Sequence, residues 1–302
     1  MLNLSQKGIS AMEYENKFYT GGFWKNITVG LPENGQTAPL PAVVLSHGHS
    51  RHRSDGLDAL AATLNRAGYV TARFDFRGCG EDARRYTLNC ASEWPADLAN
   101  AISYVSALPF VDRARVGLAG ISMGAATSVY VAGMDRRVRS VVAMGGIADC
   151  YAWIEAMWKN ADADFEGFLA RIERDRELLA LTGRSSIVSA VEMYMASEQE
   201  KRDLEQESFL TGVNAYVSLA SIRDMMDYRP IDHCPAITCP IFFAHGGADN
   251  VVPIAQSERM FSAVASEVKQ FKVYEGIEHN IPQDPNRDVV FTDIVAWFDR
   301  TL

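Results

Sequence analysis

Short apolar runs and amphipathic stretches take turns along most of this chain. The apolar runs, which predict strands buried in a sheet, span residues 41–46, 69–76, 115–119, 138–144, 239–245 and, with alternating polar positions, 268–274. The stretches between them predict helices at 57–67, 95–108 and 125–132. Strand, helix and strand in succession imply an α/β fold, a mostly parallel central sheet with helices on both faces.

Two regions depart from this alternation. The residues before Leu31 predict two or three antiparallel strands with a hairpin turn at Thr20-Gly21-Gly22. The alternation then stops at Gly145-Gly146-Ile147 and resumes only near Thr238. We therefore expect a catalytic domain made of residues 1–147 and 236–302, and a helical cap, or lid, made of residues 148–235.

The inserted stretch is helical in period throughout. We predict three apolar stripes: Phe165, Phe168, Leu169 and Ile172, ending at Gly183; Ile187, Val191, Tyr194 and Met195; and Tyr216, Leu219, Ile222 and Met226. The stretch also carries large apolar side chains that suit an acyl pocket, namely Trp153, Met157, Trp158, Phe165, Phe168, Met193 and Tyr194. Because apolar stripes mostly face a core, packing onto the sheet is the preferred role for most of them.

A candidate nucleophile lies between the predicted strand at 115–119 and the predicted helix at 125–132. The segment is Gly120-Ile121-Ser122-Met123-Gly124, a G-x-S-x-G pattern. In such an elbow the serine occupies a strained turn that only glycine neighbours can approach closely, and its hydroxyl projects from the strand edge. This pattern predicts covalent acyl transfer by Ser122.

A serine hydroxyl needs a base and an acid that orients the base. In hydrolases with this elbow, the acid and then the histidine follow the serine, each after a later strand. Asp249 follows the predicted strand at 239–245, and His279 follows the one at 268–274. A turn-forming aspartate and a solvated histidine are the alternatives, but order and context favour Asp249 as the acid and His279 as the general base.

The chemistry also requires two backbone N–H groups aimed at the developing negative charge. One is expected from Met123, the residue after the nucleophile. The other is expected from the loop after the strand at 41–46, which reads His47-Gly48-His49-Ser50. We predict that the amides of His49 and Met123 form the oxyanion hole.

These segments together resemble the α/β-hydrolase superfamily over nearly the whole chain. The resemblance rests on His47-Gly48-His49, the run RFDFRGCGE from Arg73 to Glu81, the elbow at Ser122, the HGGAD run ending at Asp249, and His279. Within the superfamily the chain is most similar to cinnamoyl or feruloyl esterases, with dienelactone hydrolases and prolyl-oligopeptidase-like proteins close behind. The resemblance implies an α/β-hydrolase fold, a Ser-His-Asp triad, and a structural role for Asp75 and Arg77.

The chain departs from these esterases at one position. The residue after His-Gly is commonly an apolar aromatic there, whereas it is His49 here. We therefore expect a more polar floor in the acyl pocket. Arg51 and Arg53 lie in the same loop; solvated surface charge is their preferred role, and holding a substrate carboxylate is the alternative.

Metal and thiol chemistry are not favoured by the sequence. His47, His49 and His52 share one loop, but no cysteine or acidic residue joins them at ligand spacing. The five cysteines lack C-x-x-C spacing and suit unpaired thiols in a reducing compartment. We assign no metal, no cofactor and no catalytic cysteine.

The composition of the chain limits the kinds of partner that it is expected to bind. The 302 residues are 48% hydrophobic and carry a net charge of −9, which argues against binding nucleic acid. Neither a secretory signal nor an apolar run of membrane-spanning length is evident, so a soluble cytoplasmic protein with no membrane partner is expected. A homodimer is left open.

The predicted function is hydrolysis of a small-molecule carboxylic ester with a small, medium-chain or aromatic acyl group, through an acyl-enzyme. The same triad serves C–C bond hydrolases, thioesterases, lactonases and amide or peptide hydrolases, so these remain alternatives. A non-catalytic ligand receptor on the same fold is a further alternative, and an unreactive Ser122 would favour it. A protein whose cap is only an interaction surface is disfavoured by the complete triad.

Overall fold

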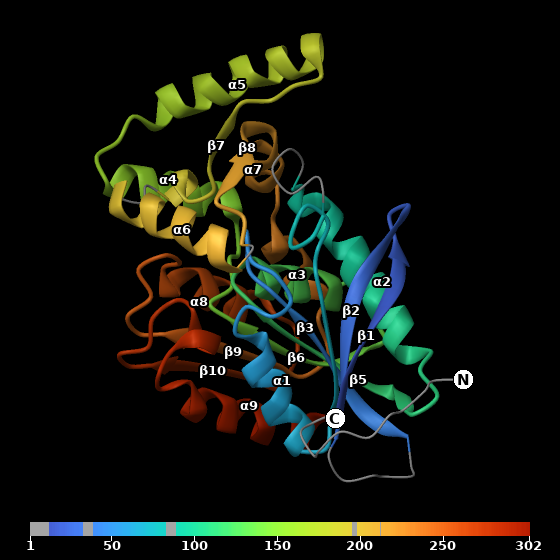
Figure 1. Cartoon of the computed structure of the whole chain (residues 1–302). Helices are drawn as coiled ribbons and strands as arrows, with labels where there is room; N and C mark the ends of the chain where they lie inside the picture. Colours follow the sequence, from blue (N-terminus) through green and yellow to red (C-terminus); the bar gives the residue numbers. More distant parts are fainter. Residues whose placement is uncertain (1–11, 33–38, 83–88, 195–197, 212) are drawn as a thin grey trace.

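A parallel sheet forms the centre of the molecule (Figure 1). The computed structural model describes residues 12–32, 39–82, 89–194, 198–211 and 213–302, and within them the sheet has the strand order β1-β2-β4-β3-β5-β6-β9-β10. The strands are β1 (Met12–Thr20), β2 (Phe23–Leu31), β3 (Leu40–Ser46), β4 (Val70–Phe74), β5 (Val111–Ile121), β6 (Val138–Met144), β9 (Ile241–Gly246) and β10 (Lys269–Tyr274). The hairpin of β1 and β2 joins β4 antiparallel, and all later pairings are parallel.

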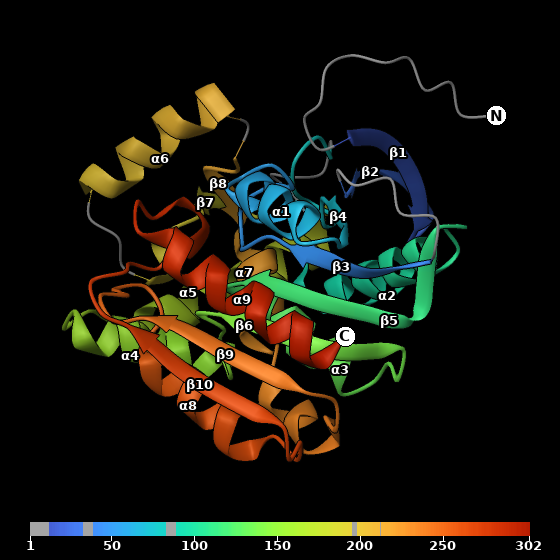
Figure 2. The same cartoon turned by 90° about the horizontal axis from the view of Figure 1, so that it is seen from below.

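Helices cover both faces of this sheet (Figure 2). The helices α1 (Leu57–Arg66) and α9 (Arg287–Thr301) pack on one face in a single apolar cluster. The helices α2 (Trp94–Ser106), α3 (Met123–Ala132) and α8 (Ile254–Ala263) lie on the other face. The predicted α/β class is confirmed, and so is the existence of each predicted strand and helix in this part of the chain.

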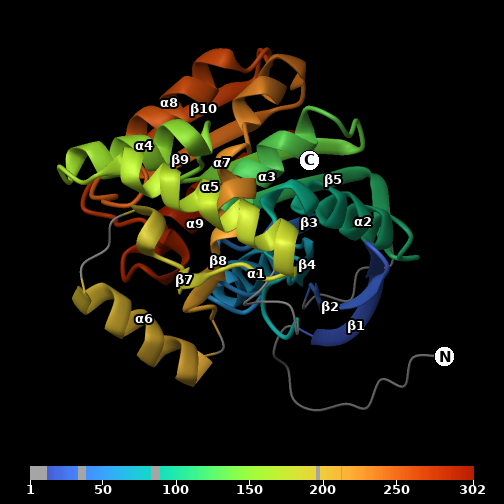
Figure 3. The same cartoon turned by 90° about the horizontal axis from the view of Figure 1, so that it is seen from above.

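The segment between β6 and β9 stands above the sheet (Figures 1 and 3). Its elements, which we call the cap, are α4 (Cys150–Asn160), α5 (Phe165–Thr182), β7 (Ile187–Ser189), a 3-10 turn at Glu192–Tyr194, α6 (Glu198–Thr211), β8 (Tyr216–Ser218) and α7 (Leu219–Met226). A second 3-10 helix, Pro230–Ala236, leads back to the sheet. The cap is therefore mainly helical, as expected.

One cap prediction is confirmed and two are wrong in part. The first stripe lies on α5, which ends at Gly183 with a left-handed φ of 69°. The second stripe is not a helix, because Ile187–Ser189 is a strand paired antiparallel with Tyr216–Ser218. The third stripe is helical only from Leu219, after the Ser218 side chain caps the helix. Pairing between two segments far apart in sequence, each with a central valine, outweighs their helical spacing. Met195 lies outside the described residues.

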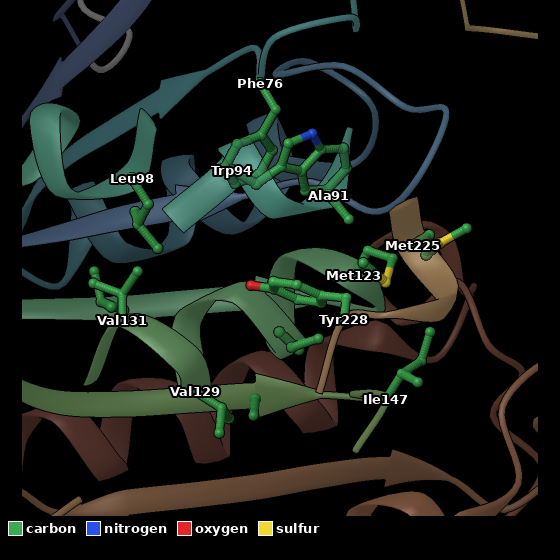
Figure 4. Close-up of a cluster of buried hydrophobic side chains, with 14 of the residues drawn as sticks. Phe76, Ala91, Trp94, Leu98, Met123, Val129, Val131, Ile147, Met225 and Tyr228 are labelled. Carbon is green, nitrogen blue, oxygen red and sulfur yellow. The ribbon is translucent and has the colours of Figure 1, made fainter. Parts of the chain in front are cut away.

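A buried apolar cluster joins the cap to the sheet beneath the elbow (Figure 4). The rings of Phe76 and Trp94 stack with centroids 4.1 Å apart. The Met123 side chain, at the start of α3, belongs to the same cluster as Ile147 and Met225 of α7, and its Sδ atom lies 3.7 Å from the Cys150 Sγ of α4. The helix that follows the predicted nucleophile is thus held by apolar contacts to the cap.

Candidate active site

Ser122 occupies a strained turn between β5 and α3. Its φ of 57° and ψ of −122° are unusual for a residue with a side chain. The turn is held because the Ser122 N–H donates to the Met144 carbonyl at 2.8 Å and the Ser122 carbonyl accepts from the Ala126 N–H at 2.9 Å. Strain fixed in this way is typical of a nucleophile elbow.

The two glycines of the elbow are required by close backbone packing. A Cβ atom at Gly124 would lie 2.2 Å from the Ser46 carbonyl oxygen, and one at Gly120 would lie 2.3 Å from the Gly124 carbonyl oxygen. Both separations are shorter than van der Waals contact allows. Only glycine therefore lets α3 begin directly against the end of β3, as the sequence analysis expected.

Asp249 and His279 meet at the ends of β9 and β10. The His279 Nδ1 atom lies 2.7 Å from Asp249 Oδ2. The other carboxylate oxygen, Oδ1, accepts from the N–H groups of Val251 and Val252 at 2.9 and 2.7 Å. Although burial by itself raises the pKa of Asp249, contacts with His245 and His279 hold that pKa well below its usual range. Asp249 is therefore a carboxylate, and the His279 nitrogen that faces it carries a hydrogen.

A single cavity brings the predicted nucleophile and base together. Ser122 and His279 both line a cavity of ≈ 100 Å³, and Gly48, His49 and Met123 line it too. All of them follow the carboxyl ends of parallel strands, which meet at one edge of a sheet. Four of the predicted site residues, Ser122, His279, His49 and Met123, therefore line one cavity, and the fifth, Asp249, contacts His279.

The predicted oxyanion donors are unoccupied by the protein itself. Within the described part of the chain, neither the His49 nor the Met123 backbone N–H has an acceptor. Buried N–H groups are nearly always paired, so two such donors beside one serine are unusual. They are free to bind an oxyanion that develops next to Ser122.

His47 holds the loop that carries the first donor. Its Nε2 accepts from the Phe76 N–H at 3.1 Å, so its Nδ1 carries the hydrogen and donates to the Gly48 carbonyl at 2.7 Å. The ring is fully buried and packs edge-on against Phe76 and Trp94. Both ring nitrogens are used inside the protein, so His47 is a structural residue.

This burial predicts a dependence of stability on pH. Burial lowers the pKa of His47 to about 4, whereas an unfolded histidine titrates near 6.5. Below pH 6.5 the unfolded chain binds this proton and the folded protein does not, so stability falls until pH 4. Between pH 7 and pH 5 His47 should remove about 2 kcal/mol of unfolding free energy. His47→Gln keeps an acceptor for Phe76 without titrating. Urea unfolding of both proteins at the two pH values should show a pH effect smaller in the variant by that amount; an equal effect would contradict the assignment.

Asp75 and Arg77 have the structural roles that the resemblance implies. Asp75 accepts from the Arg53 backbone N–H at 2.7 Å and from its guanidinium at 2.5 Å. Arg77 pairs with the fully buried Asp97 at 2.8 Å, and Asp97 also accepts from the Thr20 hydroxyl at 2.6 Å. These contacts tie the loop after β4 to the loop after β3, which carries His49 and is called the oxyanion loop below, and to the β1–β2 hairpin.

Arg51 and Arg53, for which the sequence predicted the same role, have different surroundings in the structure. Arg53 is held by Asp75, as above, and does not line the cavity. Arg51 does line it, and its guanidinium lies 2.6 Å from Glu207 of α6 and 3.3 Å from Asp55. Arg51 thus links the oxyanion loop to the cap, and its charge is already balanced by two carboxylates.

The cap supplies much of the apolar wall. Trp153, Met193 and Tyr194 line the cavity, whereas Trp158, Phe165 and Phe168 pack against one another in the cap. Sequence reasoning gave several other wall residues no place in the cavity: Ile121, Ala190, Val191, Leu204, Val251, Asn280, Pro282 and Gln283. They come from five separate segments, and no local pattern marks a residue as facing a cavity.

No metal site is formed by the described residues. Among them no group of three or more His, Cys, Asp or Glu side chains is placed to hold a metal ion. His52, the third histidine of the loop, accepts from the Ser54 N–H at 3.3 Å. In the same part of the chain no helix is long and apolar enough to cross a membrane.

Comparisons with known proteins give matches over most of the chain. A family model described as serine aminopeptidase, S33, matches residues 37–286. A monoacylglycerol lipase of Mycolicibacterium smegmatis is 23% identical over 278 residues, covering 86% of this chain and 89% of the lipase.

Two solved structures are similar across almost the whole chain. A hypothetical protein of Pseudomonas aeruginosa has a TM-score of 0.82 at 21% identity, with 100% of this chain and 99% of that one covered. Est1E of Butyrivibrio proteoclasticus, solved with bound ferulic acid, has a TM-score of 0.69 at 17% identity, with 95% and 98% covered. At these identities the structures show a shared fold.

Proposed function

Because the chain belongs to the serine aminopeptidase S33 family of α/β-hydrolases and is an esterase- or lipase-like hydrolase, we propose that it cleaves a carboxylic ester with Ser122 as the nucleophile. The substrate is a small molecule, and the reaction passes through an acyl-enzyme. In this proposal residues 1–147 and 236–302 form the catalytic domain, and residues 148–235 form the cap domain.

The chemistry follows from the position of each group. The Ser122 hydroxyl attacks the ester carbonyl while His279 accepts its proton; since Nδ1 faces Asp249, Nε2 is the accepting nitrogen. The carbonyl oxygen becomes negative between the N–H groups of His49 and Met123. His279 returns the proton to the leaving alcohol, and water attacks the acyl group by the same steps. Asp249 keeps the hydrogen on Nδ1 and stabilises the imidazolium.

One observation carries the proposal. The strained Ser122 and the Asp249-paired His279 line the same cavity, next to two backbone N–H groups without a protein acceptor in the described part of the chain. A serine that only formed a turn would not need a paired histidine and two such N–H groups beside it. The named relatives add support: one is called a monoacylglycerol lipase, and a structural neighbour binds ferulic acid.

The size of the cavity predicts a preference for short acyl chains. Its ≈ 100 Å³ is well below the roughly 300–1,000 Å³ of sites for drug-sized ligands. Turnover of p-nitrophenyl esters should therefore be highest for acetate to butyrate and at least about tenfold lower for octanoate, because a longer chain needs a wider cavity. Leu204→Ala, which removes part of the cap wall, should shift the preference toward longer chains. Equal rates for all lengths would show that the cap opens freely.

The function itself is tested with a fluorophosphonate probe and intact mass spectrometry. A single adduct on the wild-type protein, absent in Ser122→Ala, is the expected result. Ester hydrolysis is then compared with hydrolysis of aminoacyl p-nitroanilides, since the family description names an aminopeptidase. Faster cleavage of the anilides would replace esters by amides as the substrate class, and a folded protein without any adduct would favour a receptor.

A further inference from the structure

A second histidine lies against the predicted catalytic carboxylate. His245, the first residue of the HGGAD run, sits in β9 with its side chain fully buried. Its Nε2 atom is 3.2 Å from Asp249 Oδ2, the same oxygen that faces His279. Asp249 is therefore held between two imidazoles, and the sequence analysis assigned no role to the second.

The partners of His245 define where its hydrogen lies. Nε2 faces only acceptors, the Val252 carbonyl at 2.9 Å and the Asp249 carboxylate. Nδ1 lies 2.8 Å from the Ser257 hydroxyl, which can donate. Of the two neutral tautomers, only one satisfies all of these groups: the hydrogen is on Nε2, and the Ser257 hydroxyl donates to Nδ1.

We propose that His245 is a positioning residue for Asp249, donating its Nε2–H toward Oδ2 and the Val252 carbonyl so that the carboxylate keeps its orientation toward His279. The proposal rests on the proposed function, because it assigns His245 a role in the same triad. It goes beyond a packing role: a residue that only filled the space between β9 and α8 would need no donor at this point.

The loop geometry shows why such a residue is needed. Asp249 lies in a turn after β9, where its Oδ1 is fixed by the N–H groups of Val251 and Val252. Those two bonds leave Oδ2 to be oriented by what lies beside it. His245 Nε2 is hydrogen-bonded to the carbonyl of Val252 at 2.9 Å and lies 3.2 Å from Oδ2, so the imidazole closes the turn around the carboxylate. A carboxylate displaced by about 1 Å can cost a triad about 100-fold in rate.

The charges around Asp249 predict the direction in which the pH dependence of activity shifts when the His245 donor is removed. The described groups around the His245 side chain are Asp249, the Val252 carbonyl and Ser257; its register neighbour on β10 is the apolar Val273, and Ala143 and Met144 of β6 pair with the two residues before it. Asp249 is the titratable one among them, and His279 is reached through it. Removing the Nε2–H leaves the carboxylate less compensated, so it attracts the His279 imidazolium more strongly. The acid limb of the pH–activity profile should therefore move to higher pH.

Two matched variants separate positioning from packing. His245→Gln places an amide where Nε2 lies and restores a donor to Asp249. His245→Asn places its amide near Nδ1, retains a partner for Ser257 and removes the donor. Ester turnover is measured from pH 5 to pH 9, with thermal unfolding and circular dichroism as fold controls.

We expect His245→Asn to lower kcat between about 10-fold and 100-fold with KM nearly unchanged. The acid limb of its kcat/KM profile should move up by about half a pH unit, by the electrostatic argument above. His245→Gln should stay within about threefold of wild type in kcat, with its acid limb in place. Equal losses in both variants, or a change in KM alone, would overturn the positioning role.

The proposal can also fail without any variant. In the wild-type protein labelled with ¹⁵N-histidine, long-range nitrogen–proton correlations report which ring nitrogen of His245 carries the hydrogen. A hydrogen on Nε2 is expected, and one on Nδ1 alone would overturn the proposal even where both variants fail to fold. The proposed function fails by a different result, a wild-type protein that neither reacts with the fluorophosphonate nor turns over esters.

Discussion

Replacing Ser122 by alanine should leave the fold intact and remove nearly all ester turnover. The change deletes the proposed nucleophile, and the remaining N–H donors and binding contacts should retain only a small part of the rate enhancement. We expect kcat to fall by at least about 10⁴-fold, as for other serine hydrolases that lose a triad residue. The measurement is ester hydrolysis at saturating substrate, with the adduct mass from the fluorophosphonate probe as a second readout.

The matched control is a serine outside the cavity. Ser262 lies exposed on α8, so Ser262→Ala should keep both turnover and labelling. The strained backbone at position 122 is held by main-chain hydrogen bonds to Met144 and Ala126, and alanine can make the same bonds. Thermal unfolding of Ser122→Ala should therefore stay close to wild type. Retained turnover in this variant would remove Ser122 from the mechanism.

Replacing Asp249 by asparagine should lower ester turnover almost as much as Ser122→Ala does. The carboxylate accepts the His279 Nδ1–H at 2.7 Å, which leaves Nε2 able to take the serine proton. An asparagine that turns its amide N–H₂ toward Nδ1 favours the opposite tautomer, with the hydrogen on Nε2 and no base for Ser122. We expect a loss of about 10⁴-fold in kcat near neutral pH.

The pH profile distinguishes this loss from misfolding. At high pH the hydroxide concentration partly replaces the missing base, so activity of Asp249→Asn should rise with pH where wild type is flat. Labelling by the fluorophosphonate should be slow but still directed to Ser122. Full activity at pH 7 would show that another acid orients His279, and loss of circular dichroism would show that the turn after β9 needs the carboxylate.

The sequence was enough to predict which candidate residues lie together at the cavity, because its signals are local. The elbow glycines are needed because a Cβ atom at either position would lie 2.2 or 2.3 Å from a backbone carbonyl oxygen, and such a requirement leaves a readable pattern around Ser122. Asp249 and His279 follow strands that are themselves marked by apolar runs. Parallel strands bring their carboxyl ends to one edge, so order along the chain is enough to bring these residues together.

The cap was predicted less well because its signals depend on distant partners. The stripe from Ile187 has helical spacing, yet the segment Ile187–Ser189 pairs with Tyr216–Ser218. Arg51 and Arg53 are two residues apart and have the same side chain, but one lines the cavity beside Glu207 and the other is held by Asp75. Nothing within a few residues of either arginine encodes that difference.

The sequence alone determined the order of strands and helices, the strained serine turn and the identity of the predicted acid and base, since each depends on residues close along the chain. The tertiary structure decided which side chains enclose the cavity, how small it is, and that His245 shares the Asp249 carboxylate with His279. These features arise where β9, β10, α8 and the cap meet. Contacts between segments far apart in sequence depend on the packed fold, and periodicity in one segment does not report them.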